Sequence, residues 1–309
     1  MADRGDDGRR IVLDWGTSSF RAMLVDGDGR VLERVDTGDG IATVADRDFA
    51  AVLRRALEPW GDRARGLPIL AAGMIGSRNG WVEAPYVALP AGARELAAAV
   101  RREEVPELGT IRFIPGCTDT AVEPFPDVMR GEETQLLGFG LERDMAVVLP
   151  GTHSKWVRVG GERIRRFRTF ATGELFALLS QHAFIARGAE APAEPDEAAF
   201  RRGVEVALAG EGGLLARLFT VRAGWLSGGL RAAEMGDYLS GLVIGAEFRE
   251  ARDMGWFAPG EAVGVIGGAA LARRYALVAE MMGLRPEPGP EDAALRGCLR
   301  VAAEMEGMA

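Results

Sequence analysis

The sequence has very few of the residues on which disulfides and metal centres are built. Its 309 residues include two cysteines and two histidines. Cys117 and Cys298 lie far apart with no CxxC pattern, so we expect two free thiols of a reducing cytoplasm. A zinc site is not expected, because structural zinc takes four ligands that are mostly Cys and His.

Net positive charge and long apolar runs are also lacking. The formal net charge is −8, which argues against nucleic acid or an anionic membrane surface as a partner. No uninterrupted apolar run approaches the ~20 residues of a membrane-spanning helix. The first ten residues are polar and mixed in charge, unlike a secretory signal. We therefore expect a cytoplasmic protein whose partners are small molecules. A homodimer is left open.

Two familiar nucleotide-binding patterns are absent, yet one lysine stands out. There is no GxGxxG, and the surroundings of Lys155 do not match a Walker A loop. Lys155 is the only lysine of the chain and lies in the hydroxyl-rich segment Pro150–Trp156. A compact ammonium charge suits a phosphate oxygen better than a planar guanidinium does. The alternative is a lone surface lysine without a role.

The segment 11–26 indicates a strand, a polar turn and a second strand. The turn Gly16–Ser19 offers backbone amides and three hydroxyls, which can form an anion-binding concavity. Asp14 precedes it and would repel a phosphate, but a carboxylate there could hold Mg²⁺, which binds through one or two carboxylates plus phosphates. The alternative is an ordinary hairpin in which Asp14 caps the turn.

A second segment repeats this pattern about 135 residues later. A buried strand at 145–149 leads into a turn at 150–155 and a return strand at 156–159. The repetition predicts two domains, each contributing one phosphate hairpin. A third glycine turn, Gly267-Gly268, links a strand to a helix and would let a ligand approach the backbone. Close helix packing explains these glycines nearly as well, and the same two explanations apply to Ser240, Gly241 and Gly245.

Strand and helix patterns alternate along the chain, which predicts an α/β fold. Asp46 is the expected N-cap of the first helix. Further strands are expected over 31–35, 68–72, 110–114, 164–170 and 262–266. Helices are expected over 46–60, 93–102, 132–141, 173–184, 197–208, 213–219, 232–253, 269–282 and 291–305.

These motifs together resemble a known superfamily. Asp14–Arg21 resembles the first phosphate motif of the actin, sugar-kinase and heat-shock chaperone ATPases, Leu149–Thr152 the second phosphate motif, and Val265–Gly268 the adenosine motif. More narrowly, four segments resemble the 2-dehydro-3-deoxygalactonokinase family. They are Ala72–Ser77, Val128–Gln135, Pro150–Trp156 and Thr172–Leu175.

The resemblance implies two ribonuclease-H-like (actin-like ATPase) domains flanking a central cleft. Residues 1–142 would form the sugar-acid-binding domain with the first hairpin, and 143–309 the nucleotide-binding domain with the second hairpin and adenosine motif. The implied reaction is phosphoryl transfer from ATP with Mg²⁺ to the C6 hydroxyl of 2-dehydro-3-deoxy-D-galactonate, in galactonate catabolism. The alternatives are a kinase for another sugar or sugar acid, and a nucleotide-dependent switch on the same fold.

The resemblance also assigns roles to individual residues. Asp14 is the expected metal ligand. The nucleotide and its phosphates are assigned to Asp14, Gly16, Thr17, Ser18, Arg21, Gly151, Thr152, His153, Gly267 and Gly268. The sugar acid is assigned to Gly76, Ser77, Arg78, Arg130, Gly131, Thr172 and Glu174. Lys155 is expected either to neutralise the transferring phosphoryl group or to bind the acid carboxylate, a role for which Arg130 and Arg78 also compete.

The general base is expected at the start of the helix that follows Gly131. Relatives of the superfamily have an aspartate there, whereas this chain has Glu132 and Glu133. We favour one of these two glutamates, with Asp127 and then Asp119 as rivals. The alternative is that the glutamate pair only complements the helix dipole.

Overall fold

The structure, a computed structural model, describes residues 8–209 and 212–308. Within them the chain divides into two compact units, each of which is discontinuous in sequence. The first unit comprises 8–144, 159–166 and 290–308, and the second comprises the described parts of 145–158 and 167–289. These units differ from the expected ranges 1–142 and 143–309, because 143–144, 159–166 and 290–308 are grouped with the first unit.

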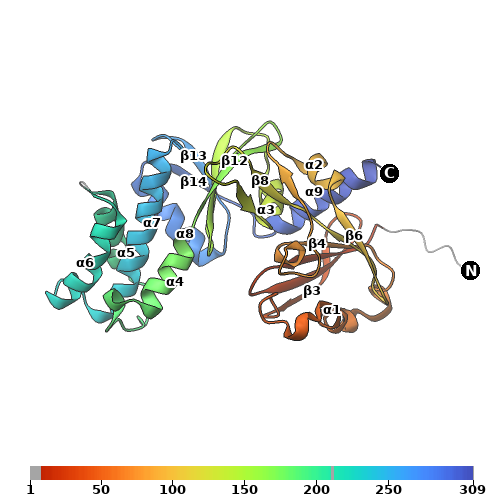
Figure 1. Cartoon of the computed structure of the whole chain (residues 1–309), viewed down its shortest axis with the longest axis horizontal. Helices are drawn as coiled ribbons and strands as arrows, with labels where there is room; N and C mark the ends of the chain where they lie inside the picture. The colour runs from red at the N-terminus through yellow and green to blue at the C-terminus, as the bar shows by residue number, and fades with distance from the viewer. Residues whose placement is uncertain (1–7, 210–211, 309) are drawn as a thin grey trace, which may run out of the picture. The chain divides into compact units, whose positions relative to one another are not determined.

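The first unit is built on a six-stranded sheet in the order β3-β2-β1-β4-β7-β6. Figure 1 labels its strands β3, β4 and β6. Its strands are β1 (Arg10–Trp15), β2 (Phe20–Val25), β3 (Val31–Thr37), β4 (Ile69–Ala72), β6 (Arg101–Val105) and β7 (Gly109–Phe113). β1 pairs antiparallel with β2 and parallel with β4, and β4 pairs parallel with β7. The carboxyl ends of β1, β4 and β7 therefore lie at one edge of the sheet, where ligand sites of α/β proteins usually form.

Apolar residues of this sheet form the core of the first unit. The ring of Trp15 packs edge-on against Phe20, with centroids 4.5 Å apart, and against Phe49 of helix α1 at 5.6 Å. Helix α1 spans Phe49–Leu57, and its N-cap is Asp48, which accepts a hydrogen bond from the Ala51 amide at 2.9 Å. The expected cap, Asp46, was wrong. It has φ 51° inside a short 3₁₀ turn, so no helix can start there.

The expected helix over 93–102 is also wrong in its second half. Helix α2 ends at Ala98, and Arg101–Val105 forms the edge strand β6, antiparallel to β7. Ladder hydrogen bonds with β7 override the helix propensity of its Arg and Glu residues, and charged residues suit a solvent-facing edge strand. A three-stranded sheet that the sequence did not indicate consists of β5 (Tyr86–Ala88), β8 (Gly116–Asp119) and β9 (Asp127–Met129), in the order β5-β8-β9.

Two helices complete the first unit by crossing at glycines. Helix α3 spans Glu132–Phe139, and α9 spans Ala293–Gly307. A Cβ at Gly138 would overlap the carbonyl oxygen of Ala293, and one at Gly297 would overlap that of Thr134. This close crossing fixes the position of α3, whose first turn carries Glu132 and Glu133.

The second unit is built around a sheet in the order β12-β11-β10-β13-β14, with helices packed against it. Its strands are β10 (Met145–Leu149), β11 (Ser154–Gly160), β12 (Arg163–Phe170), β13 (Ala262–Val265) and β14 (Arg285–Pro288). Its helices are α4 (Thr172–His182), α5 (Glu197–Leu208), α6 (Leu214–Leu226), α7 (Met235–Asp253) and α8 (Ala269–Met281). The tip of the β11–β12 hairpin, 159–166, belongs to the first unit, where Ile164 bridges Ala91.

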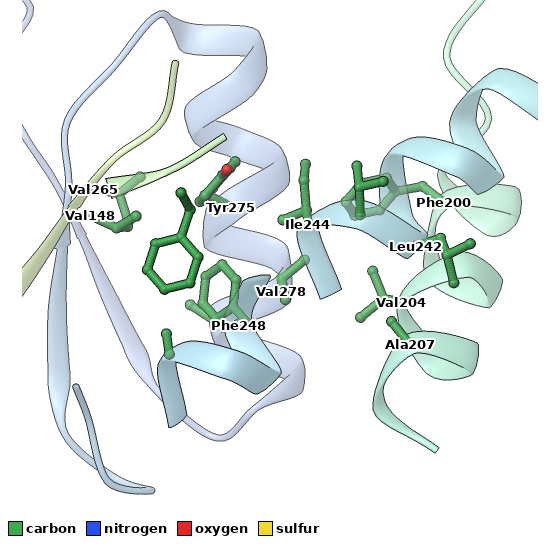
Figure 2. Close-up of a cluster of buried hydrophobic side chains, with 14 of the residues drawn as sticks. Val148, Phe200, Val204, Ala207, Leu242, Ile244, Phe248, Val265, Tyr275 and Val278 are labelled. Carbon is green, nitrogen blue, oxygen red and sulfur yellow. The ribbon is translucent and has the colours of Figure 1, made fainter. Parts of the chain in front are cut away.

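One continuous apolar core joins this sheet to its helices. Figure 2 shows the core running from Val148 and Val265 of the sheet, past Phe248, to Val204 and Ala207 of α5. Helices α5 and α7 lie side by side (Figure 1) because glycines let their backbones touch. A Cβ at Gly241 would overlap the carbonyl oxygen of Phe200, for example.

Short 3₁₀ helices occupy several connections. They are Ala45–Arg47, Glu58–Arg63, Met74–Gly76, Phe184–Ala186 and Ala232–Glu234. Across 8–209 and 212–308, none of the helices has the length and apolar character needed to cross a membrane.

Candidate active site

Asp14 and Arg21 form the charged end of the first hairpin. They are cross-strand partners in β1 and β2, and Arg21 Nη1 lies 2.9 Å from Asp14 Oδ2. Arg21 also reaches Asp36, with Nε 3.4 Å from Oδ1. The Asp14 side chain remains 19% exposed. The described residues contain no cluster of three or more His, Cys, Asp or Glu that could hold a metal ion alone. A cation at Asp14 would therefore need ligand oxygens from a bound phosphate, as Mg²⁺ commonly does.

The turn after Asp14 is held rigidly while its side chains face solvent. Gly16 donates its amide to the Ser19 carbonyl at 2.9 Å, and Thr17 and Ser18 are exposed. A loop braces the turn, since Ala42 donates to the Thr17 carbonyl at 3.1 Å and Gly40 contacts the Thr17 and Ser18 backbone. The exposed hydroxyl side chains are thus carried on a fixed backbone, as anion binding requires.

Three backbone segments of the first unit converge beside Asp14. Gly73 follows β4 with φ 92°, and a Cβ there would lie 2.7 Å from the Trp15 carbonyl oxygen. Gly131 precedes α3 with φ 105°, and a Cβ there would lie 3.3 Å from Cα of Gly73. Only glycine fits this backbone conformation and this spacing comfortably. The loops 73–78 and 130–133 are therefore neighbours of the Asp14 end of β1.

Arg130 is buried, and two of its three guanidinium nitrogens have no hydrogen-bond partner in the described residues. Only 7% of the residue is exposed, and its Nη2 donates to the Ala84 carbonyl at 2.8 Å while its Cζ lies 4.3 Å from the ring centroid of Tyr86. Its Nε and Nη1 make no hydrogen bond within the described parts of the chain, and the same holds for the buried hydroxyl of Ser77. Such groups are costly to bury unpaired, so they indicate a place for a polar ligand.

The backbone of Gly76 lies close to this guanidinium. Arg130 Nη1 lies 3.2 Å from where a Cβ would stand at Gly76, so a side chain there would crowd it. Arg78, the other expected arginine of this loop, is exposed. The structure thus brings Gly76, Ser77, Arg130 and Gly131 together in the first unit.

The two glutamates of α3 have different environments. Glu132 is partly exposed, and its Oε2 accepts the Arg130 amide at 3.0 Å. Glu133 is fully buried, and both its oxygens accept the Gly131 amide, at 2.9 and 2.8 Å. Burial, and next the charge of Glu132, raise the pKa of Glu133 to about 8. At neutral pH Glu133 is therefore mainly a neutral acid.

The rival aspartates lie in the small three-stranded sheet. Asp119 of β8 and Asp127 of β9 are cross-strand partners. Asp119 is buried and accepts the Ala121 amide at 3.1 Å, while Asp127 is half-buried and accepts the Val128 amide at 2.8 Å. Each carboxylate thus has a local backbone partner.

In the second unit, the turn after β10 docks on the start of α4. A Cβ at Gly173 would overlap the Gly151 carbonyl oxygen, and the Glu174 amide donates to the Thr152 carbonyl at 2.9 Å. His153 Nε2 lies 2.8 Å from Glu174 Oε2, and both side chains are about half exposed. Helix α4 has no side-chain cap, and because the Glu174 amide is already used, the amides of Thr172 and Gly173 are the ones suited to an anion.

Lys155 lies on strand β11, which begins at Ser154, and not in the turn where the sequence suggested it. It is 4% exposed, and its Nζ donates to the His153 carbonyl at 2.9 Å. A buried lysine is a poor candidate for a surface residue without a role. The ammonium group is tied to the same turn that carries Gly151 and Thr152.

A cavity of about 370 Å³ lies in the second unit, of the size of a small-molecule site. It extends from Gly151 and the start of α4 to α7 and α8. Its lining residues include Thr172, Gly173, Phe176, Asp237, Ser240, Val243, Leu271, Arg274 and Tyr275. Arg274 is paired with Asp237 and stacked over Phe200 at 5.2 Å. Of the small residues in α7, Ser240 lines this cavity, while Gly241 and Gly245 pack against α5.

The glycine turn at the end of β13 lies beside the end of β10. Val265 of β13 is the parallel partner of Val148, and a Cβ at Gly267 would lie 3.4 Å from the Pro150 carbonyl oxygen. Gly267 and Gly268 are exposed, and α8 follows them directly. The structure thus places Gly151, Thr172 and the residues after Gly268 around one site in the second unit.

Several residues of these sites were missed by sequence reasoning. Tyr86 and Ala84 hold Arg130 from a segment about 45 positions earlier, and no local pattern marks them. Arg274 could have been found, because it lies in the second turn of the helix that follows the Gly267-Gly268 turn.

The protein has an actin-like ATPase fold. The activator of 2-hydroxyisocaproyl-CoA dehydratase from Clostridium difficile, solved with bound ADPNP, shares the fold with a TM-score of 0.51 over 97% of both chains. Its sequence is 10% identical, so this likeness concerns the fold alone.

Closer comparisons give the family. The model of the 2-keto-3-deoxy-galactonokinase family matches residues 14–301, and the chain belongs to this family. The 2-dehydro-3-deoxygalactonokinase of Escherichia coli (strain K12) is 36% identical over 297 residues, covering 96% of this chain and 97% of the relative. A solved structure from Sinorhizobium meliloti, provisionally given the same name, has a TM-score of 0.85 and 35% identity over 97% of this chain and 99% of its own. The family resemblance read from the sequence is confirmed.

Proposed function

We propose that this protein transfers the γ-phosphoryl group of MgATP to the C6 hydroxyl of 2-dehydro-3-deoxy-D-galactonate. The observation that carries this proposal is the buried Arg130 close to Gly76, two of whose nitrogens make no hydrogen bond within the described residues, in a chain whose relatives are named for this kinase. A sugar acid has a carboxylate that a neutral hexose lacks. A guanidinium with spare N–H groups is the side chain best suited to bind it.

The second unit would hold the nucleotide. The cavity between α4, α7 and α8 is large enough for a nucleoside, with Gly267 and Gly268 at the adjoining turn. The phosphates would meet the Gly151–His153 turn and the amides of Thr172 and Gly173 at the start of α4. The first unit would contribute Asp14 as a ligand of the cation, and Arg21 and the Gly16–Ser18 turn as donors to phosphate oxygens. When bound, Mg²⁺ neutralises phosphate charge and so lowers the barrier to transfer.

In the transfer step the acceptor oxygen forms a bond to the γ-phosphorus while the bond from that phosphorus to the bridging oxygen of ADP breaks. The hydroxyl proton passes to a carboxylate base. Glu132 is our candidate because it is partly exposed at the start of α3, next to Arg130. Glu133 is the weaker candidate, since it is buried and mainly protonated at neutral pH. Asp127 remains the rival.

The remaining polar groups have supporting roles in this proposal. Ser77, Gly76 and Gly131 would surround the sugar acid near Arg130. Thr172 and Glu174, which the motif assigned to the sugar acid, lie beside the Gly151–His153 turn of the second unit. We infer that they also support the phosphate end of the nucleotide. A cytoplasmic setting fits the two buried free thiols. The homodimer stays a prediction.

The proposal is tested by ADP release over a panel of acceptors. We expect fast release with 2-dehydro-3-deoxy-D-galactonate and slower release with its C4 epimer or a neutral hexose. Arg130→Gln should raise the acceptor KM, by about tenfold or more for a lost charged contact. The exposed Arg78 provides the comparison, and Arg78→Gln should have little effect. A preference for the neutral hexose, or an acceptor KM that changes only in Arg78→Gln, would refute the assignment.

A further inference from the structure

Glu247 of α7 is a buried carboxylate to which side chains of three other elements donate hydrogen bonds. The residue is 3% exposed. Its Oε1 accepts from Ser154 Oγ at 2.7 Å and from Trp156 Nε1 at 2.9 Å, and its Oε2 accepts from Tyr275 Oη at 2.6 Å. The side chain of Thr172 hydrogen-bonds to it as well. Four donors match the roughly four lone-pair directions of one carboxylate.

Each donor belongs to a segment that forms the nucleotide half of the site. Ser154 and Trp156 begin β11, directly after the Gly151–His153 turn. Thr172 is the first residue of α4, and Tyr275 belongs to α8. Thr172 and Tyr275 also line the 370 Å³ cavity, whereas Glu247 is not among its lining residues. Figure 2 shows Tyr275 and Phe248, the neighbour of Glu247 in sequence, within the packed core.

We propose that Glu247 is a positioning residue that holds the phosphate-side turn, the start of α4 and the α8 wall in nucleotide-binding geometry before the nucleotide arrives. It acts through Ser154, Thr172 and Tyr275 and does not touch the ligand. The assignment of the cavity to ATP rests on the proposed function. The contacts of Glu247 do not depend on which acceptor is phosphorylated.

A carboxylate at position 247 has a physical reason. Burial raises the pKa of Glu247, and its hydrogen bonds from Thr172, Tyr275, Ser154 and Trp156 oppose that rise. An apolar residue would avoid the cost of burying a carboxylate, but it would leave these donors unpaired. A single acceptor that serves three segments fixes their mutual spacing more tightly than apolar packing alone.

The test is ADP binding by titration calorimetry, with no acceptor present. Glu247→Gln keeps the side-chain volume, but its amide nitrogen cannot accept a hydrogen bond, so either Tyr275 or the pair Ser154 and Trp156 loses its acceptor. We expect the Kd for ADP to rise about tenfold, the effect of losing about one well-made hydrogen bond at the site. Ser154→Ala removes a single donor without altering the cavity lining, so its Kd should rise less and in the same direction. It also provides a result should Glu247→Gln fail to fold.

Thr220→Val is the matched control. It removes a different side-chain hydrogen bond of the second unit, Thr220 Oγ1 to Tyr238 Oη at 2.8 Å, away from the cavity. It should lower the Tm and leave the Kd for ADP unchanged. The proposal is overturned if folded Glu247→Gln and Ser154→Ala bind ADP as the wild type does, if Thr220→Val weakens ADP binding equally, or if the wild type binds no ADP. A wild type that binds ADP but phosphorylates no sugar acid would refute the proposed function only.

Discussion

Glu133 accepts one amide N–H, that of Gly131, with both of its carboxylate oxygens, at 2.9 and 2.8 Å. Gly131 has φ 105°, and its neighbours in sequence are Arg130 and Glu132. The buried side chain therefore holds the short segment that carries the proposed carboxylate-binding arginine and the proposed base. This gives Glu133 a structural reason to be present without contact to a substrate.

The pKa of Glu133, about 8, makes stability depend on pH. Between an unfolded value near 4.5 and about 8, the folded state keeps the proton and the unfolded state loses it, so the free energy of unfolding falls as pH rises. The full effect of this single group is on the order of 5 kcal/mol. Glu133→Gln should show a flatter profile and gain stability relative to the wild type between pH 5 and pH 8.5. Urea unfolding across this range measures it, and parallel profiles would contradict the raised pKa.

The base assignment predicts a selective loss of kcat. Glu132→Gln is nearly isosteric and keeps an oxygen for the Arg130 amide, so the protein should fold and its KM for ATP should change little. General-base catalysis is worth about 10²–10⁴-fold, and kcat should fall within that range. Asp127→Asn is the companion variant, measured by the same steady-state assay. Near-normal kcat in Glu132→Gln with a large loss in Asp127→Asn would transfer the role to Asp127.

Asp14→Asn should leave the hairpin folded while turnover falls about 100-fold or more, because the cation loses its protein carboxylate. The Asp14–Arg21 pair is partly exposed, so its loss should cost no more than about 1 kcal/mol of stability. Asp36→Asn removes the other partner of Arg21 and should leave turnover unchanged. Turnover would be titrated with Mg²⁺, and an Asp14→Asn enzyme as active as the wild type at limiting Mg²⁺ would rule out the assignment.

The kinetics of Lys155 variants distinguish the two candidate roles of this residue. If its ammonium neutralises the transferring group, Lys155→Met should lower kcat and the slow background ATP hydrolysis together. If it binds the acid carboxylate, only the acceptor KM should rise. We expect the first result, since Nζ bonds to the His153 carbonyl in the phosphate-side turn. Lys155→Arg should also be impaired, because a planar guanidinium does not fit a buried point-charge site. If Lys155→Met and Lys155→Arg are both fully active, Lys155 has no role in the reaction.

The sequence carried enough local information to predict the hairpins. In 11–25 the apolar residues flank a polar turn, so the cross-strand meeting of Asp14 and Arg21 follows from strand geometry. The start of α3 at Glu132 was likewise predicted, because Gly131 precedes a run of helix-forming residues. Helix boundaries that depend on tertiary contacts were not predicted correctly. Helix α6 runs on to Leu226 where the pattern suggested an end at 219.

The environments of the site residues could not be predicted, since they depend on contacts between distant segments. Ser154 and Glu247 are 93 positions apart, and Arg130 lies 46 positions from the carbonyl of Ala84. No periodicity in the sequence records such pairs. The burial of Lys155 was missed for the same reason, because a seven-residue motif shows the residue types but not what packs over them.

The crossing of α3 and α9 has a consequence for how the chain is made. Helix α9 is synthesised after all the other described helices, and it packs against elements of the first unit that were made long before. At a synthesis rate of about 5–20 residues per second, the ribosome adds the whole second unit, on the order of ten seconds of elongation, before α9 becomes available. During that interval the side of α3 that packs against α9, which includes Gly138, is not covered by α9. In a cell, this is the stage at which chaperones would have most reason to bind the chain.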